Sequence, residues 1–461
     1  MVFRARRTTA LIGTSAAVVL ALSACASDDS SSSGGGGGAA ADMSIDCSAY
    51  EGFGDLKGTE VDVYTTVVAP EDESYIESFK PFEECTGVTV NYEGSKEFEA
   101  QLPVRVAGGN APDIALIPQP GLLKTMVKTG KVVQAPAETL ANVDELFGED
   151  WKAYGTVDGT FYAAPLGANV KSFVWYSPSM FEEGGYEVPE TWDDLMSLTE
   201  DIASKAENDA KPWCAGFGSG DATGWPGTDW LEDMVLRGGG PEVYDQWVTH
   251  EIPFNDPQIV ESLGLASAIL KNDKYVNGGL GDVRTVATTS FQDAGLPIQD
   301  GSCYMHRQAS FYASNWPEGT EVAADGDVWA FHLPGKDADG EKPVLGGGDF
   351  AAAFTDRPEV KAFQTYLSSA DWANNKAMAT VNGGWVSANK ELDAANLVSP
   401  IDRLSAEILQ DPDAVFRFDG SDLMPSAVGA GTFWKEMTNW VASDKQDKAV
   451  LDSIERSWPR S

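Results

Sequence analysis

The sequence predicts an α/β protein with two lobes, each a mostly parallel sheet flanked by helices. Short apolar segments of strand character alternate with amphipathic segments of helical period after the N-terminal tract. This alternation favours parallel sheets that carry helices on both faces. Roughly 415 residues follow the polar tract, and a single hydrophobic core seldom organises that many.

The first part of this body has the order strand, helix, strand, helix, strand. We expect strands at 61–65, 88–92 and 113–117, with helices at 72–84 and 96–107. Ligands of such sheets bind beyond the carboxyl ends of the strands. The loops at 65–72, 93–96 and 118–121 are therefore the first candidates for a binding site.

Later segments are more varied. Residues 172–176 predict another strand, and Thr191 with an acid at Asp194 predicts a capped helix start without functional meaning. Residues 213–240 are rich in glycine and aromatic side chains and lack a clear period, so we expect no long helix there. The run at 359–379 has helical character.

The N-terminus predicts an exported, lipid-anchored protein. Three arginines precede an apolar run at 10–22 that is too short to span a bilayer and fits a signal peptide over 1–24. The run ends in Leu22-Ser23-Ala24-Cys25, which resembles a bacterial lipobox with Cys25 as the lipid-modified residue. The alternative is an ordinary secretory signal with a chance cysteine.

Residues 25–46 predict a flexible tether behind that anchor. The Ser/Gly tract at 26–41 cannot bury apolar surface and behaves as a coil. About sixteen such residues reach roughly 20–25 Å. We therefore expect a globular body held at the extracellular face of the cell membrane, in contact with the membrane only through the lipid.

Charge and hydropathy exclude several functions. The formal net charge of the chain is −39, and loss of three arginines with the signal peptide makes it −42. So acidic a body does not bind nucleic acid through bulk electrostatics. Beyond the signal segment no apolar stretch approaches eighteen residues, so the chain is not expected to form a pore.

Catalytic motifs are also missing from the sequence. His250, His306 and His332 lack metal-site spacing, and the chain has neither a Gly-x-Ser-x-Gly elbow nor a Gly-x-x-x-x-Gly-Lys phosphate loop. Two of the 71 acidic residues could form a glycoside hydrolase pair, but nothing marks such a pair. We expect no enzyme, no metal and no cofactor.

Four cysteines remain once Cys25 is assigned to lipid, an even number in an oxidising compartment. Four cysteines allow three pairings. We favour Cys47 with Cys85, because they flank one strand–helix unit, and Cys214 with Cys303, because they fall in one predicted lobe.

Four stretches in order resemble a known family. The first combines residues 87–93 and the later Ala107-Gly-Gly-Asn-Ala-Pro-Asp-Ile114, and the second combines residues 164–177 and the later 188–195. The third is the segment 303–311, and the fourth is Met424-Pro-Ser-Ala-Val-Gly-Ala-Gly-Thr-Phe-Trp434. Together they resemble the maltose-binding-protein-like family of extracellular solute-binding proteins over nearly all of 55–461. The motifs Gly94-Ser-Lys-Glu-Phe-Glu and Asp422-Leu-Met-Pro are most similar to those of the alpha-glucoside-binding branch.

The resemblance implies a two-lobed periplasmic-binding-protein fold of type II. It places lobe 1 at 47–166 and 354–400, lobe 2 at 170–346 and 408–461, and hinge crossings near 166–170, 346–353 and 398–408. Glycine absorbs large backbone changes, so the triplet Gly346, Gly347 and Gly348 suits a hinge. A tight turn beside a strand is the alternative.

A sugar site needs flat aromatic faces and several polar partners. The resemblance places Trp434 and Phe311 as stacking aromatics, with core packing as the alternative. Trp225, Asp221 and Asp229 lie in a polar, Gly-rich segment, and Trp385 follows a strand-end pattern but could equally fill a lobe.

Strand ends supply the polar candidates, each of which could instead be a solvated surface group. They are Lys96, Gln119, Asn169, Lys171, Arg307, Gln308 and Asp349. The segment 117–121 differs from the corresponding part of maltose-binding protein. That protein has an aromatic residue and an Asp-Arg pair just after the third strand, and this sequence has Ile117-Pro118-Gln119-Pro120-Gly121 instead.

The resemblance implies an extracellular substrate-binding lipoprotein of an ABC importer. We expect a monomer that binds a small carbohydrate, an alpha-glucoside or a short oligosaccharide, and delivers it to the permease transmembrane subunits. The alternative is a lipoprotein that senses sugar for a receptor partner. An extracellular glycoside hydrolase is disfavoured by the resemblance to a family of binding proteins.

Overall fold

The structure is a computed structural model that describes residues 43–279, 282–338 and 340–459. The predicted signal peptide, Cys25 and most of the tether lie outside the described residues. Among the residues described, no helix has the length and apolarity needed to cross a membrane.

The first sheet has six strands in the order β13-β12-β3-β1-β2, with β6 paired to β12. Its strands are β1 Glu60–Thr65, β2 Thr89–Gly94, β3 Ile114–Ile117, β6 Ala163–Val170, β12 Lys342–Ala353 and β13 Ala414–Phe418. Strand β1 is parallel to both β2 and β3, so the predicted βαβαβ unit is confirmed. Strand β12 is antiparallel to β3 and β6 and parallel to β13.

The second sheet has five strands in the order β11-β7-β10-β8-β9. Its strands are β7 Phe173–Tyr176, β8 Lys211–Cys214, β9 Val276–Asn277, β10 Cys303–Arg307 and β11 Trp329–His332. Strand β8 is parallel to β9 and β10, whereas β7 is antiparallel to β10 and β11. A short hairpin of β4 Thr156–Val157 and β5 Thr160–Phe161 completes the described strands.

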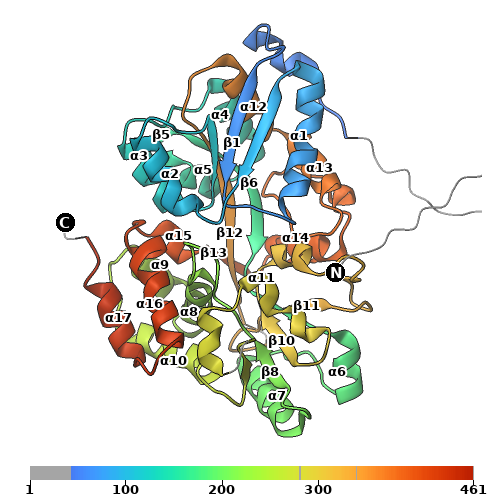
Figure 1. The fold of residues 1–461 in the computed structure, drawn as a ribbon, viewed down its shortest axis with the longest axis vertical. Helices are drawn as coiled ribbons and strands as arrows, with labels where there is room; N and C mark the ends of the chain where they lie inside the picture. The colour runs from blue at the N-terminus through green and yellow to red at the C-terminus, as the bar shows by residue number, and fades with distance from the viewer. Residues whose placement is uncertain (1–42, 280–281, 339, 460–461) are drawn as a thin grey trace, which may run out of the picture. The chain divides into compact units, whose positions relative to one another are not determined.

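Helices flank both sheets (Figure 1). The α-helices are α1 Asp72–Thr86, α2 Phe98–Ala107, α3 Pro120–Lys128, α4 Ala137–Leu146, α5 Glu149–Tyr154, α6 Pro178–Gly184, α7 Trp192–Lys205, α8 Trp225–Gly238, α9 Pro241–Val248, α10 Pro257–Leu270, α11 Phe291–Ala294, α12 Pro358–Leu367, α13 Ala370–Ala379, α14 Pro400–Gln410, α15 Gly420–Leu423, α16 Trp434–Val441 and α17 Asp447–Glu455. Short helices of other types are η1 Cys47–Phe53, η2 Val283–Ala287, η3 Leu296–Ile298, η4 Ser310–Asn315, η5 Ala394–Asn396 and η6 Val428–Phe433.

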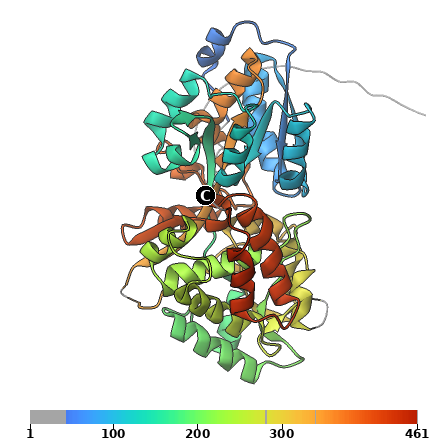
Figure 2. The ribbon, with the colours of Figure 1, turned by 90° about the vertical axis from the view of Figure 1, so that its left-hand side faces the viewer.

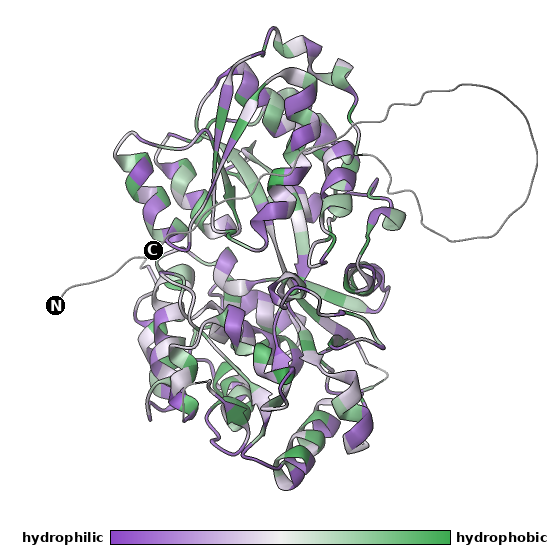
Figure 3. Cartoon of the chain, turned by 45° about the vertical axis from the view of Figure 1, so that its right-hand side comes forward, coloured by the Kyte–Doolittle hydropathy of each residue, from purple (hydrophilic) through white to green (hydrophobic). Residues whose placement is uncertain are grey.

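The helices packed on the sheets are amphipathic. Most change between hydrophilic and hydrophobic residues along their length (Figure 3), as helices with one buried face do. At α7, the Thr191 hydroxyl accepts a hydrogen bond from the backbone N–H of Asp194 at 3.1 Å, as the capping pattern predicted. Sequence period and capping therefore positioned this helix correctly.

Helix α8 corrects the expectation of no long helix at 213–240. It runs for 14 residues, and every residue from 226 to 237 is buried. Its polar side chains, among them Asp229, Asp233 and Arg237, pair with other buried groups and not with water, so the helix has no solvent-facing side of the usual kind. The glycine that suggested a loop, Gly224, precedes the helix with φ +117°, and Pro226 lies in its first turn.

The predicted helical run at 359–379 is two helices, α12 and α13. The break falls at Ser368 and Ser369, and the Ser369 hydroxyl accepts a hydrogen bond from the Trp372 N–H at 3.1 Å. Serine at the N-cap satisfies a backbone donor that has no partner within the helix. The hydroxyl therefore starts a new helix where the pattern alone suggested continuity.

The glycine triplet at 346–348 lies inside β12, so the alternative of a tight turn is wrong. A Cβ on Gly346 would lie 2.2 Å from the Phe416 ring, and one on Gly348 would lie 2.3 Å from the Gly167 carbonyl oxygen. These glycines allow neighbouring strands to approach closely. Strands β6 and β12 pass through two of the three expected hinge crossings (Figures 1 and 2), and the hinge itself stays a prediction.

The cysteines approach one another in the favoured pairing. The Cα atoms of Cys47 and Cys85, and those of Cys214 and Cys303, are 5.7 Å apart in each pair, within the range of disulfides. The second pair joins β8 to its neighbour β10. Both links would fasten segments that already pack together.

We predict that non-reducing peptide mapping of the secreted protein finds both links and no free thiol among these four cysteines. Closing the loop of 89 residues between Cys214 and Cys303 restricts the unfolded chain by about 4–5 kcal/mol in the chain-entropy treatment. The Cys214→Ser/Cys303→Ser protein should therefore melt at a lower temperature than the parent. Detection of either cysteine as a free thiol in the parent would contradict the pairing.

Candidate functional site

A cavity of about 190 Å³ lies where loops of the two sheets meet. One water molecule needs only about 10–15 Å³ by the same measure, so the cavity has room for a small organic molecule. All three loops expected from the strand-end rule contribute to its wall, through Glu71, Lys96 and Gln119 among others. Residues from α8, α11 and η4 also line the cavity.

Nine of the thirteen predicted ligand-binding residues line this cavity. They are Lys96, Gln119, Asn169, Lys171, Trp225, Phe311, Asp349, Trp385 and Trp434. They come from distant parts of the chain, so the fold brings them together. Their contact with a ligand stays a prediction.

Four predicted residues do not line the cavity. Asp221 is exposed, and its carboxyl hydrogen-bonds to Glu97, which raises the pKa of Glu97. Asp229 and Arg307 are buried and paired with other charges, and the Gln308 side chain accepts a hydrogen bond from the Ala309 N–H at 2.8 Å. Strand-end position alone did not distinguish side chains that reach the cavity from those that pack behind it.

Three aromatic rings form one wall of the cavity. The Trp225 ring is 5.0 Å from that of Phe291 and 5.9 Å from that of Phe311 between centroids, in edge-on and tilted arrangements. The Lys171 ammonium lies 5.4 Å from the Trp225 centroid. Trp434 also lines the cavity but is only 3% exposed.

A second aromatic group surrounds a lysine. The Lys376 ammonium lies 4.3 Å from the Tyr75 ring centroid and 5.1 Å from that of Trp385. It donates hydrogen bonds to the hydroxyls of Ser74 at 2.8 Å and Thr380 at 3.0 Å. Burial lowers the pKa of Lys376 to about 7, against the opposing effect of nearby carboxylates.

The sequence analysis missed several residues of the cavity wall, among them Glu71, Glu99, Phe291, Lys376 and Asp422. Glu71 falls in the predicted loop at 65–72, so the strand-end rule could have found it. Burial raises the pKa of Glu71 and of Glu99 to about 7 each. No local pattern marked Phe291 or Lys376, because only the tertiary fold carries them to the cavity.

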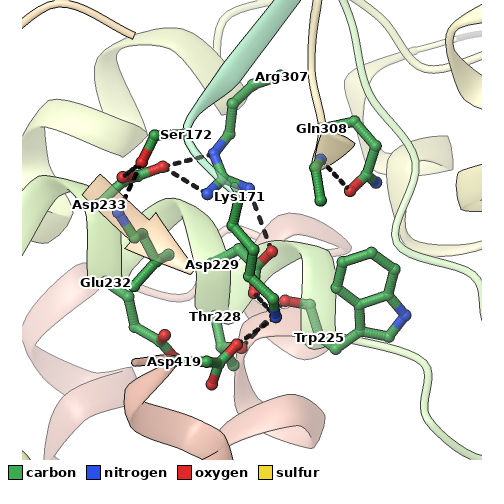
Figure 4. Close-up of polar contacts among 12 residues, drawn as sticks. Lys171, Ser172, Trp225, Thr228, Asp229, Glu232, Asp233, Arg307, Gln308 and Asp419 are labelled. Carbon is green, nitrogen blue, oxygen red and sulfur yellow. Dashed lines mark hydrogen bonds and ion pairs between the residues drawn. The ribbon is translucent and has the colours of Figure 1, made fainter. Parts of the chain in front are cut away.

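A network of buried charges lies behind the aromatic wall (Figure 4). Lys171 pairs with Asp229 at 3.1 Å and with Asp419 in a shorter contact. Arg307 donates to Asp233 at 2.8 Å and to Asp229 at 3.3 Å. Its other members are Ser172, Glu232, Arg237 and Asp422.

This network holds five carboxyl groups against three cations. The pKa values of Glu232 and Asp422 are raised well above the ordinary range, first by burial and then by the charge of Asp419. Burial would also raise the pKa of Asp233, but Arg237 and Arg307 outweigh it and lower that pKa. Burial without a matching cation therefore favours the protonated form of Glu232 and Asp422.

Carboxylate oxygens of Asp229, Glu232 and Asp419 lie within 4.8 Å of one another, the one group with metal-site spacing in the described part of the chain. The Lys171 ammonium contacts two of these three carboxylates. It supplies the positive charge that a metal ion would otherwise bring. The arrangement is that of an ion-pair network.

The sequence profile of the bacterial extracellular solute-binding proteins matches residues 67–394. The chain belongs to this family. The cavity between two sheets is thus the expected place for a solute. As its relatives indicate, this solute-binding protein is of the ABC sugar-importer kind and is not an enzyme.

Two curated relatives match most of this solute-binding protein. The osmoprotective compounds-binding protein GgtB of Synechocystis is 39% identical over 411 residues, which cover 88% of this chain and 94% of GgtB. The alpha-glucosides-binding periplasmic protein AglE of Rhizobium meliloti is 38% identical over 419 residues, 88% of each chain. These matches confirm the family proposed from the four sequence motifs.

Solved structures show the same fold at low sequence identity. The bacterial solute receptor AcbH has a TM-score of 0.71 at 18% identity, covering 86% of this chain and 98% of AcbH. RafE, solved in complex with raffinose, has a TM-score of 0.67 at 19% identity, covering 87% and 98%. The type II two-lobed fold predicted from the sequence is thereby confirmed.

Proposed function

We propose that this protein is the lipid-anchored, extracellular receptor of an ABC importer and that it binds a small alpha-glucoside, which it delivers to the permease. The observation that carries the proposal is the cavity wall, where Trp225, Phe291 and Phe311 stand beside carboxylate, amide and ammonium groups. A sugar presents apolar C–H faces and a rim of hydroxyl groups, which these two kinds of side chain complement.

The relatives support the class of ligand. AglE is named for alpha-glucosides, and GgtB for osmoprotective compounds, at nearly equal identity to this chain. The cavity volume of about 190 Å³ favours a small solute over a long oligosaccharide. A compact glucoside is consistent with the names of both relatives and with the cavity volume.

A thermal-shift screen of residues 42–461 tests the proposal. The panel contains alpha- and beta-linked glucosides, mono- and trisaccharides, and small uncharged osmoprotective solutes. A ligand at a hundred times its dissociation constant adds about 2.7 kcal/mol to the folded state. Stabilisation by alpha-glucosides above the other compounds is the expected result, and stabilisation by none of the glucosides would refute the ligand assignment.

We predict that Cys25→Ser releases the protein into the medium. The lipobox and the Ser/Gly tract motivate the anchor, and no helix within 43–279, 282–338 and 340–459 is long and apolar enough to hold the body at the membrane. Fractionation of cells that express the parent and the variant measures the effect. Cys214→Ser/Cys303→Ser serves as a control that leaves the lipobox intact, and retention of the Cys25 variant at the membrane would contradict the anchor.

We predict that ligand affinity increases severalfold as the pH falls from 7 to 5.5. Glu71 and Glu99 line the cavity, and burial raises their pKa values to about 7, above the ordinary value of 4.5. A carboxyl whose pKa is raised in the binding form favours that form at low pH and loses this contribution as the pH rises through about 7. Lys376, with its pKa lowered to about 7, is about half charged at pH 7 and mostly charged at pH 5.5, so it opposes the effect of the two carboxyl groups and reduces it in part.

Calorimetric titration at several pH values checks this dependence. Glu99→Gln removes one of the two titrating groups and should reduce the slope of the logarithm of affinity against pH by about half. An affinity that is constant from pH 5.5 to 7 in the parent would show that closure does not bury these carboxyl groups.

A further inference from the structure

Helix α3 and the segment 422–426, far apart in sequence, meet beside the cavity. The contact is a backbone approach at Gly121, where an added Cβ would lie 2.0 Å from the Met424 carbonyl oxygen and 3.0 Å from that of Asp422. One turn further along α3, the Thr125 and Ser426 hydroxyls are hydrogen-bonded at 3.1 Å. Helix α3 follows β3 of the first sheet, whereas segment 422–426 begins in the last residues of α15, which contacts α8 and α9 beside the second sheet as well as α3 and β13.

Gly121 is not required by its own helix. It lies within α3, with Pro120 before it in the first turn, and it needs no left-handed conformation. Alanine is favoured over glycine inside a helix. The reason for glycine at this position is therefore the close approach of segment 422–426, not the local backbone.

Other contacts join the same two parts of the protein around the cavity. The Lys96 ammonium donates to the Gln292 side chain, and Asn315 donates to Glu71 at 3.2 Å. These contacts are made by side chains that can exchange partners with water. The Gly121 contact differs, because a backbone carbonyl faces it and no side chain can move aside to make room.

We infer that Gly121 is a positioning residue for solute capture: α3 docks on segment 422–426 when the lobes close over the ligand, and this docking requires the absence of a side chain at position 121. The inference rests on the proposed function and extends it, since it names the contact that permits closure. A side chain at position 121 would keep the two surfaces apart and reduce the population of the closed form. Apparent affinity falls in proportion to that population.

Gly121→Ala tests the inference, with Gly264→Ala as the matched control. Gly264 lies inside α10, and a Cβ added there meets no atom within 4 Å. The expected result is at least a tenfold loss of affinity in Gly121→Ala, with a ligand-free melting temperature equal to or above that of the parent, and no change of affinity in Gly264→Ala. Affinity equal to the parent would overturn the inference, and so would a large fall in the ligand-free melting temperature, which would mark a permanent packing contact.

A second measurement does not depend on the identity of the ligand. The pair Thr125→Cys/Ser426→Cys replaces two hydroxyls that are hydrogen-bonded in this structure, so it should form a disulfide under mild oxidation whenever α3 docks on segment 422–426. Addition of Gly121→Ala should slow this reaction severalfold, whereas Gly264→Ala should not. Equal rates in the two backgrounds would overturn the inference, while failure of every glucoside in the screen would refute only the proposed ligand.

Discussion

Trp225→Ala should weaken binding of the preferred saccharide about 30- to 150-fold while changing the melting temperature of the ligand-free protein little. The indole is only partly buried and lines the cavity, between Phe291 and Phe311 and next to Lys171. Truncation of a central aromatic contact typically costs about 2–3 kcal/mol. This is a large share of the roughly 8 kcal/mol that a micromolar binder gains in total.

The two tryptophans of the cavity wall should behave differently. Trp434, the stacking residue implied by the resemblance, is only 3% exposed, and its indole N–H donates to the Ser421 hydroxyl at 3.4 Å. Trp434→Ala should therefore lower stability by about 3–5 kcal/mol as a buried aromatic does, in addition to any loss of affinity. Near-normal affinity in a destabilised Trp434→Ala protein would assign this residue to packing.

Calorimetric titration and melting curves on the same samples separate the two effects. Trp225→Phe serves as the control, because it keeps an aromatic face and should retain most of the affinity. A Trp225→Ala protein that binds as tightly as the parent would show that the wall formed with Phe291 and Phe311 does not stack on the ligand.

Local patterns predicted the parts of the fold that depend on local physics. The strands and helices from β1 to β3 were found within a few residues, because half-buried strands and amphipathic helices have characteristic periods. Helix α8 was missed because its charged residues face buried partners such as Arg307 and not solvent, so polar and apolar residues do not mark an outer and an inner side. The role of Gly346 and Gly348 was also missed, since the close neighbours Phe416 and Gly167 belong to other strands.

The site was predictable where the strand-end rule applies and not beyond it. Gln119 and Lys171 line the cavity as expected, whereas Arg307 at the end of β10 turns into the buried network. Phe291 and Lys376 lie on helices, in α11 and α13, and no sequence pattern places these helices near a ligand. Residues contributed by the packing of remote helices need the tertiary structure.

Arg307→Met should lower the free energy of unfolding by about 3–5 kcal/mol at neutral pH. The guanidinium has no exposed surface and neutralises Asp233 and Asp229, with donor distances to them of 2.8 and 3.3 Å. Removal of one partner of a buried ion pair leaves a carboxylate without a neutralising charge. Such a change typically lowers the free energy of unfolding by about 3–5 kcal/mol. The remaining partners, Arg237 and Lys171, then face an excess of negative charge.

Urea denaturation of the parent and of two arginine variants measures this cost. Arg284→Met is the matched control, because Arg284 pairs with Asp444 at the surface, where the two side chains are 52% and 88% exposed. Such exposed pairs contribute less than about 1 kcal/mol. Equal losses of unfolding free energy in Arg307→Met and Arg284→Met would show that the buried network stabilises the fold no more than an exposed ion pair does.

The pH dependence of the Arg307→Met deficit identifies its cause. In the parent, Arg237 and Arg307 lower the pKa of Asp233 against the effect of burial, so this carboxylate stabilises the fold above its ordinary pKa and loses that contribution in acid. Without Arg307, protonation of Asp233 relieves the uncompensated charge. The difference between parent and variant should therefore shrink as the pH falls below about 5, whereas a deficit caused by lost packing alone would stay constant.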